Sequence, residues 1–348
     1  MSSRTPVFAA LLAALLFGAS TPIAKVLVGD VPPMLLAGLL YLGSGIGLWI
    51  IRLLRGPQRR IPTLPGRDWL WFTGAIVSGG VVGPVLLMNG LQQTSAASAS
   101  LLLNLEAVLT ALLAWIVFRE NADRRLVLGM LLIVAGGAVL SWPHDGAAPG
   151  TVRGALLIAG ACLCWAVDNN LTRKVSATDA DFVAGTKGLV AGTINFGLAM
   201  AFGASLPSAL LVASALTLGL FAYGMSLVLF VLALRGLGSA RAGAYFSTAP
   251  FLGAVIAIVV LHEPTPAGFL LSAVLMGAGV MLHLLERHEH EHTHELLDHS
   301  HPHSHDVHHR HEHGFAWDGS EPHTHAHRHD PVTHEHPHYP DLHHRHGH

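Results

Sequence analysis

Three ionisable side chains stand inside long apolar stretches of the chain, where a charge is costly. Glu106 lies near the middle of one stretch, Asp168 near the end of a second, and Lys187 inside a third. A charged side chain at the centre of a bilayer costs at least about 2–3 kcal/mol, so it usually faces the interior of a helix bundle and marks a substrate or ion path. These three residues are therefore candidates for substrate binding or proton transfer.

Each candidate also has a structural interpretation. Asp168 and Lys187 either face a central cavity, where one of them binds or takes up a proton, or form an ion pair between helices or reach the lipid headgroups. Glu106 either carries a proton, as a proton-coupled carrier requires, or bonds to Asn89 or a neighbouring helix as a structural contact. The remaining candidate substrate ligands are polar or aromatic residues of the apolar stretches, namely Asn89, Asn104, Trp165, Asn169, Asn170, Asn195 and Tyr245.

Histidine is the second residue type whose side chains could bind metal ions or protons. It is concentrated at the end of the chain. Of 26 histidines, 23 follow residue 285, and most recur as His-x-His. The segments 299–313 and 334–348 form a repeat with ten identical positions. In an extended chain, residues two apart lie on the same side about 6.5–7 Å from each other. Two such imidazoles can share or bridge a metal ion.

Imidazole side chains of the tail can bind divalent Zn, Ni, Co or Cu, and the affinity of imidazole does not by itself distinguish among these four metals. The tail contains no cysteine, which favours several exchangeable sites over one closed structural zinc site. Protons compete with metal ions for the same imidazole nitrogens, so the tail could also sense pH. A third alternative is that the repeat binds metal without physiological use. The candidate metal ligands are His299, His301, His303, His305, His308, His309, His311, His313, His334, His336, His338, His343, His344, His346 and His348.

Composition divides the chain after residue 285. The first part carries 16 Lys plus Arg against 10 Asp plus Glu, and the rest carries 4 against 12. Only 12% of all residues are charged and 51% are hydrophobic, whereas soluble domains have about 25% charged residues. The first part therefore belongs in a bilayer. The tail has too few large apolar residues to form a core, so it is predicted to be disordered without metal.

Ten apolar stretches have about the 20 residues that a helix needs to cross a bilayer. The predicted fold is an all-α integral membrane protein with ten transmembrane helices followed by the His-rich tail. The predicted spans are Pro6–Val28, Pro32–Leu54, Trp69–Gly90, Ala96–Phe118, Leu126–Trp142, Val152–Leu171, Phe182–Gly203, Leu210–Leu234, Ala240–Leu261 and Ala267–Leu285.

Positive charges collect in alternate loops, and this pattern orients the bundle. Short cytoplasmic loops are rich in Lys and Arg. With ten spans, the pattern places both termini in the cytoplasm of a cell-membrane protein, so the His-rich tail is predicted to face the cytosol. The basic loops carry Arg52, Arg55, Arg59, Arg60, Arg67, Arg119, Arg124, Arg125, Arg173, Lys174, Arg235 and Arg241.

The body contains an internal repeat. Shifting the sequence by 143 residues sets Val117–Leu140 over Val260–His283 and Glu120 over Glu263. Each half then has five helices, and an odd number forces the halves into opposite orientations, a feature of secondary transporters with a site near midplane. The predicted organisation is two five-helix repeats, 1–142 and 143–285, and a tail, 286–348.

The segment from Ser95 to Leu140, SAASASLLLNLEAVLTALLAWIVFRENADRRLVLGMLLIVAGGAVL, resembles the fourth and fifth helices of EamA-type transporters in the drug/metabolite transporter superfamily. The shared pattern is a start of small residues, a step like LEPV, an ALLAW run, a glutamate cap and a Gly-rich helix. The resemblance covers residues 6–285 in two copies. Ala107 stands where the family has proline, so a kinked fourth helix is not supported, whereas Pro250 keeps that place in the second copy. The resemblance implies a ten-helix carrier of small metabolites and does not specify the substrate.

Two functions follow from the sequence. In the first, the chain is a secondary-active transporter, in the direction of efflux, of a small metabolite or a divalent metal, and the tail binds metal for sensing or delivery. In the second, the body is mainly an anchor and the tail is a metal buffer or chaperone. The body contains no Gly-rich phosphate loop, nucleophile elbow or metalloprotease motif, so no enzyme and no cofactor in the body are predicted. The predicted partners are lipid, the substrate and protons; a homodimer stays open, and no nucleic acid is expected.

Overall fold

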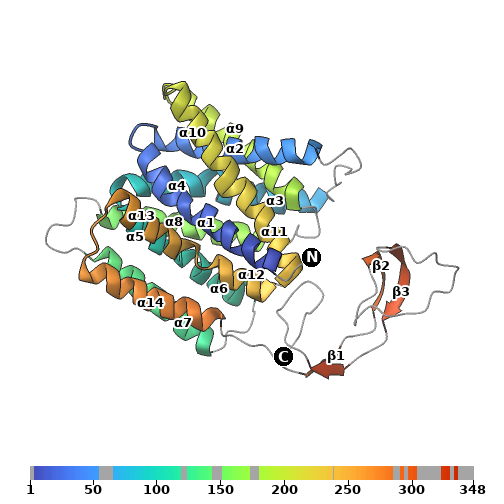
Figure 1. Ribbon diagram of the computed structural model, residues 1–348. Helices are drawn as coiled ribbons and strands as arrows, with labels where there is room; N and C mark the ends of the chain where they lie inside the picture. The colour runs from blue at the N-terminus through green and yellow to red at the C-terminus, as the bar shows by residue number, and fades with distance from the viewer. Residues whose placement is uncertain are drawn as a thin grey trace. The chain divides into compact units, whose positions relative to one another are not determined.

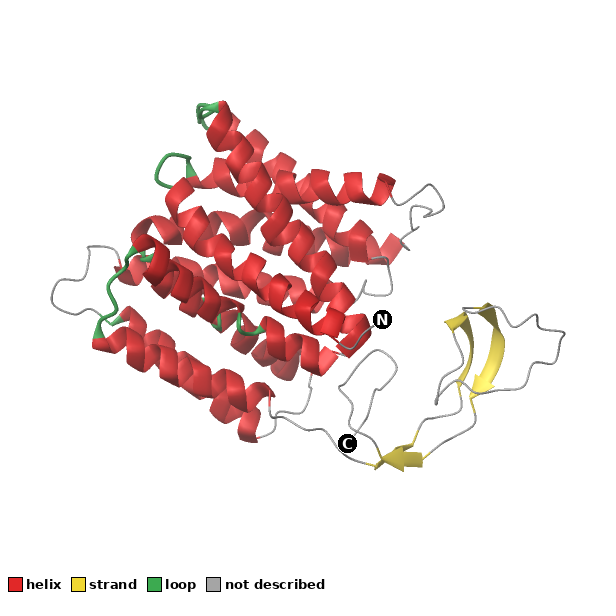
Figure 2. Ribbon diagram, viewed as in Figure 1, coloured by secondary structure: helices red, strands yellow, loops and turns green. Residues whose placement is uncertain are grey.

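The computed structural model describes residues 4–54, 66–118, 124–142, 151–172, 180–237 and 239–284 of the body, and 291–293, 297–303, 323–329 and 333–335 of the tail. The chain divides into two units, Met1–Leu285 and Glu286–His348. Among the described residues, the first unit forms helices and the second unit forms short strands (Figure 2).

The helices follow the same order in both halves of the first unit. In the first half they are α1 (Arg4–Leu27), α2 (Pro33–Leu54), α3 (Gly66–Ala75), the π-helical segment η1 (Ile76–Val82), α4 (Gly83–Gln93), α5 (Ala96–Leu102), α6 (Leu105–Phe118) and α7 (Arg124–Ser141). In the second half they are α8 (Thr151–Thr172), α9 (Ala180–Ala201), α10 (Ala209–Gly219), the π-helical segment η3 (Leu220–Met225), α11 (Ser226–Leu237), α12 (Ser239–Phe246), α13 (Ala249–Leu261) and α14 (Ala267–Leu284). The repeated order supports a duplication, while the opposite orientation of the halves stays a prediction.

Helices occupy all ten apolar stretches of the sequence. In the described residues, nine helical stretches are long and apolar enough to cross a membrane. The stretch outside this set is α9, which has 22 residues and carries Lys187 and Asn195 among its apolar side chains. The described part of the chain therefore supports a multi-pass membrane protein, and the crossing by α9 stays a prediction.

The third and fourth helical stretches are interrupted in each half. A π-helical segment separates α3 from α4, and another separates α10 from α11. The break between α5 and α6 has a different cause, because the amide of Asn104 donates to the carbonyl of Leu101 over 2.8 Å. Such side-chain bonds compete with the helical ladder. The fourth stretch therefore breaks even though Ala107 replaces the proline of the family pattern.

Close helix contacts depend on glycine. Helix α2 packs along α9 and α10, and α7 packs along α14 (Figure 1). A Cβ on Gly43 of α2 would lie 2.1 Å from the carbonyl oxygen of Leu216 in α10, and a Cβ on Gly219 would lie 2.0 Å from that of Leu40. Small residues allow membrane helices to approach in this way.

A Gly43→Ala variant is expected to destabilise the bundle by about 1–3 kcal/mol, the usual cost of overpacking. The matched control is Gly197→Ala in α9, where a Cβ would have no neighbour within 4 Å. There alanine stabilises a helix by about 0.5–1 kcal/mol. The midpoint of thermal unfolding in detergent is expected to fall for Gly43→Ala and to stay or rise for Gly197→Ala. Equal midpoints for both variants would contradict the α2–α10 contact.

The outer faces of the helices expose large apolar side chains, as expected of a surface in contact with lipid. Exposed examples from α7 and α14 are Leu128, Leu131, Leu270, Leu271 and Val274. The buried core joins both halves and includes Leu36, Leu40, Leu91, Leu102, Ile133, Ile158 and Met276.

The described residues of the tail form four short strands, which are β1 (Glu291–Thr293), β2 (Leu297–His303), β3 (His323–His329) and β4 (Thr333–Glu335). Strand β1 pairs antiparallel with β4, and β2 pairs antiparallel with β3. The prediction that the tail is disordered without metal stays a prediction.

Candidate substrate site in the helical unit

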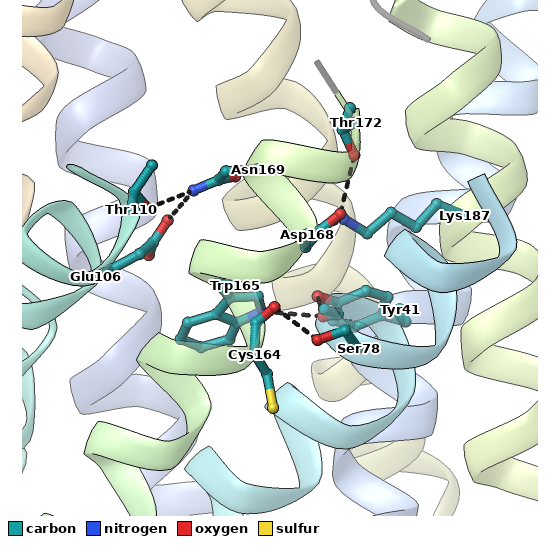
Figure 3. A network of polar contacts seen from close by, with 11 residues as sticks. Tyr41, Ser78, Glu106, Thr110, Cys164, Trp165, Asp168, Asn169, Thr172 and Lys187 are labelled. Atoms are coloured by element: carbon teal, nitrogen blue, oxygen red, sulfur yellow. Dashed lines mark hydrogen bonds and ion pairs between the residues drawn. The ribbon is translucent and has the colours of Figure 1, made fainter. Parts of the chain in front are cut away.

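Helix α8 carries four of the ten candidate residues; it packs against α6 and η1, and Lys187 of α9 reaches its Asp168 (Figure 3). Its last turns read WAVDNNLT, so four candidate residues follow one another within two turns. Consecutive residues on a helix point in different directions, and α8 is surrounded by other helices. The structure accordingly connects the candidates of α8 to three different elements.

The first connection is an ion pair between α8 and α9. The Lys187 ammonium donates to Asp168 Oδ2, and Thr172 Oγ1 donates to Asp168 Oδ1 over 2.9 Å. The exposed fractions are 20% for the Lys187 side chain and 5% for the Asp168 side chain. The structure thus forms the interhelical ion pair that the sequence left as one of two alternatives, and both charges are largely removed from solvent.

The second connection joins α8 to α6. Asn169 Nδ2 donates to Glu106 Oε1 over 2.9 Å and lies 3.4 Å from Thr110 Oγ1. Glu106 is half-buried and Asn169 is exposed. Beside this pair, the amide of Asn170 donates to the carbonyl of Ala166 in its own helix and to that of Thr110. A single carboxylate therefore faces an amide across the α6–α8 contact.

The third connection uses the backbone of η1. The carbonyl of Gly79 accepts from Tyr41 Oη and from Trp165 Nε1, each over 2.9 Å. The amide of Asn195 donates to the carbonyls of Gly80 and Val81 over 3.3 and 3.2 Å. A π-helical turn shifts the backbone out of its regular ladder, and here side chains from α2, α8 and α9 bond to its carbonyl groups.

Gly79 also brings η1 against the ion pair. A Cβ on Gly79 would lie 2.5 Å from Asp168 Cβ, so only glycine allows this approach. The Asp168–Lys187 pair, the Glu106–Asn169 pair and the bent η1 backbone are thus parts of one polar cluster. We call it the central cluster. Of the ten candidate residues from the sequence it contains Glu106, Trp165, Asp168, Asn169, Asn170, Lys187 and Asn195.

Three candidate residues lie outside the central cluster. Asn89 donates to the carbonyl of Val85 over 2.7 Å, within α4, and Asn104 bonds to Leu101 next to the break in its own stretch. Tyr245 packs with alanines of α1, α11 and α12. The structure gives Glu106 an amide partner, as the structural interpretation expected, but the partner is Asn169 of α8 and not Asn89.

The sequence did not single out several members of the central cluster. Gly79, Thr110 and Thr172 contact candidate residues, and Tyr41 donates to the same Gly79 carbonyl as Trp165. Ser78 Oγ donates to the carbonyl of Cys164 over 2.8 Å. Hydroxyl residues and glycines are common in membrane helices, so their type alone carries little signal. Only Tyr41 had a usable signal, because the chain has just 4 tyrosines and this one stands in the middle of an apolar stretch.

Comparison with known proteins decides the class of the chain. The model of the EamA-like transporter family matches residues 4–142 and 152–285. The chain belongs to the EamA-like transporter family. The family resemblance of the sequence is therefore confirmed, and this family member is a membrane transporter protein.

Individual relatives agree with the family. The chain is similar to an uncharacterized transporter of Methanothermobacter thermautotrophicus, with 28% identity over 286 residues, covering 78% of this chain and 83% of the relative. It is also similar to the uncharacterized transporter YvbV of Bacillus subtilis, with 24% identity over 290 residues and coverage of 80% and 91%. One solved crystal structure shares the fold, with a TM-score of 0.60 and 23% sequence identity. The match covers 79% of this chain and 95% of the chain in that structure. A family of transporters is also consistent with the prediction that the chain is not an enzyme.

The glutamate cap of this EamA-like transporter is visible in the second half. Glu263 follows α13, and its two carboxylate oxygens accept from the backbone N–H groups of Ala96 and Ala97 over 2.8 and 2.7 Å. A carboxylate stabilises the N-terminus of a helix by satisfying free N–H groups and by complementing the helix dipole. Glu263 therefore has a structural contact that joins the fourth and ninth helical stretches. Its sequence equivalent, Glu120, lies outside the described residues.

A Glu263→Ala variant is expected to lose about 1–3 kcal/mol of stability, because two N–H groups lose a charged acceptor. Glu263→Gln keeps one acceptor oxygen and is expected to lose roughly half as much. Thermal unfolding of the detergent-solubilised transporter measures both. A Glu263→Ala protein that unfolds at the wild-type temperature would show that the cap contributes nothing.

The candidate metal ligands of the tail are placed only in part. His299, His301 and His303 lie in β2, and His334 lies in β4. The other candidate histidines lie outside the described residues, namely His305, His308, His309, His311, His313, His336, His338, His343, His344, His346 and His348.

Proposed function

We propose that this EamA-like protein is a secondary-active transporter of the cell membrane that exports a small metabolite or a divalent metal ion. The observation that carries the proposal is the central cluster, in which Glu106, Asp168 and Lys187 converge on one region from α6, α8 and α9. A protein that only anchors a tail does not need three ionisable groups inside its bundle, since each is costly to insert.

The residues of the central cluster have different roles in transport. Glu106 takes up and releases the coupling proton, and Asn169 holds the carboxyl group in place. The Asp168–Lys187 pair opens to receive a charged substrate, so that each partner exchanges an internal contact for one to the solute. The amides of Asn170 and Asn195 and the indole of Trp165 complete the polar lining. Access alternates by rocking of the two halves around this site.

The proposal includes the topology predicted from the charges of the loops. Helix α9 completes the set of ten spans as the seventh in chain order, because it packs along α2 through close contacts of Gly45 with Gly188 and Leu189. Its Lys187 ammonium and its Asn195 side-chain amide donate to groups of α8 and η1. With ten spans both termini lie in the cytoplasm. The tail then binds Zn, Ni, Co or Cu ions from the cytosol and either delivers them to the transport path or senses them.

Uptake into everted membrane vesicles tests the transport function. The probes are Ni²⁺, Co²⁺, Zn²⁺ and a set of amino acids, each followed with and without a proton gradient. We expect gradient-dependent accumulation of one probe that a protonophore abolishes. Vesicles that contain Asp168→Asn protein are the matched control, and equal accumulation in both would refute the central cluster as the transport site.

A chain truncated after Arg287 separates this function from the alternative, a membrane-anchored metal buffer. If the truncated protein still transports at the full rate, the tail is accessory to the carrier. If metal tolerance of the cells disappears on truncation but survives Glu106→Gln and Asp168→Asn, the carrier function is refuted and the buffer function is supported.

A further inference from the structure

The first helix of each half packs on the helices of the other half. Helix α1 packs against α10, η3, α11, α12 and α13, and α8 packs against α3, η1, α4, α5 and α6 (Figure 1). We call these two sets the α1 group and the α8 group, each with its first-named helix. In a carrier that alternates access by rocking, two such groups separate at one end of the bundle while they meet at the other.

Contacts between the two groups are concentrated at one end. Helix α5 packs along α13, and α1 packs against α4 and α5. The sequence repeat relates α1 to α8, α4 to α11, α5 to α12 and α13 to α6. The equivalent contacts would therefore join α6 to α12 and α8 to both α11 and α12. Within the described parts of the body, none of these three pairs forms an extended contact. We call the junction of α1, α4, α5 and α13 the closed end.

Small residues bring three helices together at the closed end. A Cβ on Gly253 of α13 would lie 2.6 Å from the carbonyl oxygen of Gly18 in α1 and 2.8 Å from Ser100 Oγ in α5. Ser100 is only 1% exposed, and its hydroxyl has no hydrogen-bond partner in the structure. A buried hydroxyl without a partner disfavours the closed arrangement, because water satisfies it once the helices separate. The closed end is thus tightly packed and still able to open.

Two charged side chains join the groups across the closed end. The Lys25 ammonium of α1 donates to the carbonyl of Leu91 in the last turn of α4. Glu263, which follows α13, accepts from the N–H groups of Ala96 and Ala97 at the start of α5, and its charge attracts Lys25. A cation at the C-terminus of a helix and an anion at the N-terminus of another are both favourable. Each side chain therefore ties the α1 group to a helix end of the α8 group.

We propose that Lys25 holds the outer gate of the transporter shut. It acts as a positioning residue, since it bonds to the backbone of α4 and not to the central cluster. When the ammonium exchanges the Leu91 carbonyl for water, α1 and α13 are released from α4 and α5. The side chain suits such an exchange, because it is a compact and strongly hydrated charge on a flexible stem, and it is half-buried.

The proposed topology determines which side the gate faces. Helix α6 leads to the basic loop before α7, which this topology places in the cytoplasm, so the closed end faces the outside. The structure then corresponds to the inward-open state, and the side chain of Asn169 in the central cluster is exposed in it. This inference rests on the proposed function, and it adds the residue that controls one of the two access paths.

The rate at which a buried cysteine is labelled tests the gate. The chain has two cysteines, and Cys162→Ala/Cys164→Ala gives the background. The reporter is Ser100→Cys, a nearly isosteric change at the closed end. The reference reporter is Ser272→Cys in α14, which is also fully buried but packs on α7 outside both groups. A membrane-impermeant maleimide is added to right-side-out and to everted vesicles.

The test variants change the charge at position 25. Lys25→Met is expected to speed labelling of Ser100→Cys by at least about tenfold, the shift in population that follows from loss of a hydrogen bond with a charged donor. Lys25→Gln is the second test variant, because its polar side chain is tolerated at a half-buried position, and it is expected to act in the same direction. Lys25→Arg keeps a charged donor and is expected to recover most of the slow labelling.

The matched control is Arg153→Met. Arg153 is an exposed cation at the start of α8, and the adjacent Gly154 packs on Thr94 between α4 and α5, so this charge lies at the same end of the bundle. Its removal is expected to leave labelling of Ser100→Cys unchanged. Labelling of Ser272→Cys is expected to stay slow in every variant, and the acceleration by Lys25→Met is expected in right-side-out vesicles only.

Three results would overturn the proposal. They are an unchanged rate for Ser100→Cys in Lys25→Met and Lys25→Gln, an equal acceleration of Ser272→Cys, which would indicate general loosening, and an acceleration confined to everted vesicles. If the first of these occurs while the uptake assay shows gradient-driven transport, the gate is refuted and the proposed function stands. If the expected labelling is found but no probe is transported, the transport function is refuted and Lys25 still controls the opening of this end.

Discussion

A Glu106→Gln variant is expected to reach the membrane in normal amounts and to lose proton-driven transport by at least about 100-fold. Glutamine cannot take up a proton, and removing a proton-transferring side chain typically costs about 10²–10⁴ in rate. It has nearly the same size, and its amide oxygen can still accept from Asn169 Nδ2, as Glu106 Oε1 does over 2.9 Å. The initial rate in everted vesicles with an imposed proton gradient measures the loss.

A control variant separates proton transfer from packing. Asn89→Ala alters an amide outside the central cluster that bonds within its own helix. It is expected to transport within about twofold of the wild type, and both variants should unfold at similar temperatures. Proton-driven transport by Glu106→Gln at the wild-type rate would assign Glu106 to a structural role.

Breaking the ion pair from one side is expected to have the largest effect on stability. Lys187→Met leaves the Asp168 carboxylate without its cation, and removal of one partner of a buried pair costs about 3–5 kcal/mol. The low exposed fractions of 20% and 5% place the pair in this class. Thr172 still donates to the other carboxylate oxygen, so the low end of the range is expected. The midpoint of thermal unfolding in detergent records the change.

The double variant Asp168→Asn/Lys187→Met decides between the two interpretations of the pair. It leaves no unpaired charge, so stability is expected to return to within about 1 kcal/mol of the wild type. If the pair receives the substrate, transport stays abolished in this stable protein. A double variant that recovers both stability and transport would show that the pair only holds α8 against α9.

The transmembrane stretches could be predicted from the sequence because apolarity over about 20 residues is a local property. For example, the predicted span Ala96–Phe118 coincides with α5 and α6 together. The break between these helices was not predicted, since it depends on one bond from Asn104 to a backbone carbonyl. The π-helical segments η1 and η3 were missed for a different reason: they are short changes in backbone hydrogen bonding that leave composition and periodicity almost unchanged.

The sequence predicted which residues form the site from their type, but it predicted their contact partners only in part. Glu106, Asp168 and Lys187 stand out because a charge in an apolar stretch needs an explanation, and the structure brings them into one cluster. The neighbours of Glu106 depend on how α6 meets α8. Asn89 and Asn169 are equally polar in the sequence, and only the packing makes Asn169 the partner and leaves Asn89 bonded within α4.

The sequence by itself determined the membrane class of this chain, the helical stretches, the family and the concentration of histidine in the tail. These follow from composition, from apolar periods and from motifs, which are properties of neighbouring residues. Only the tertiary structure decided which residues meet: Asp168 with Lys187 across α8 and α9, and Gly79 against Asp168. The physical reason is that a contact between distant residues depends on helix packing, which the sequence of a single segment does not determine.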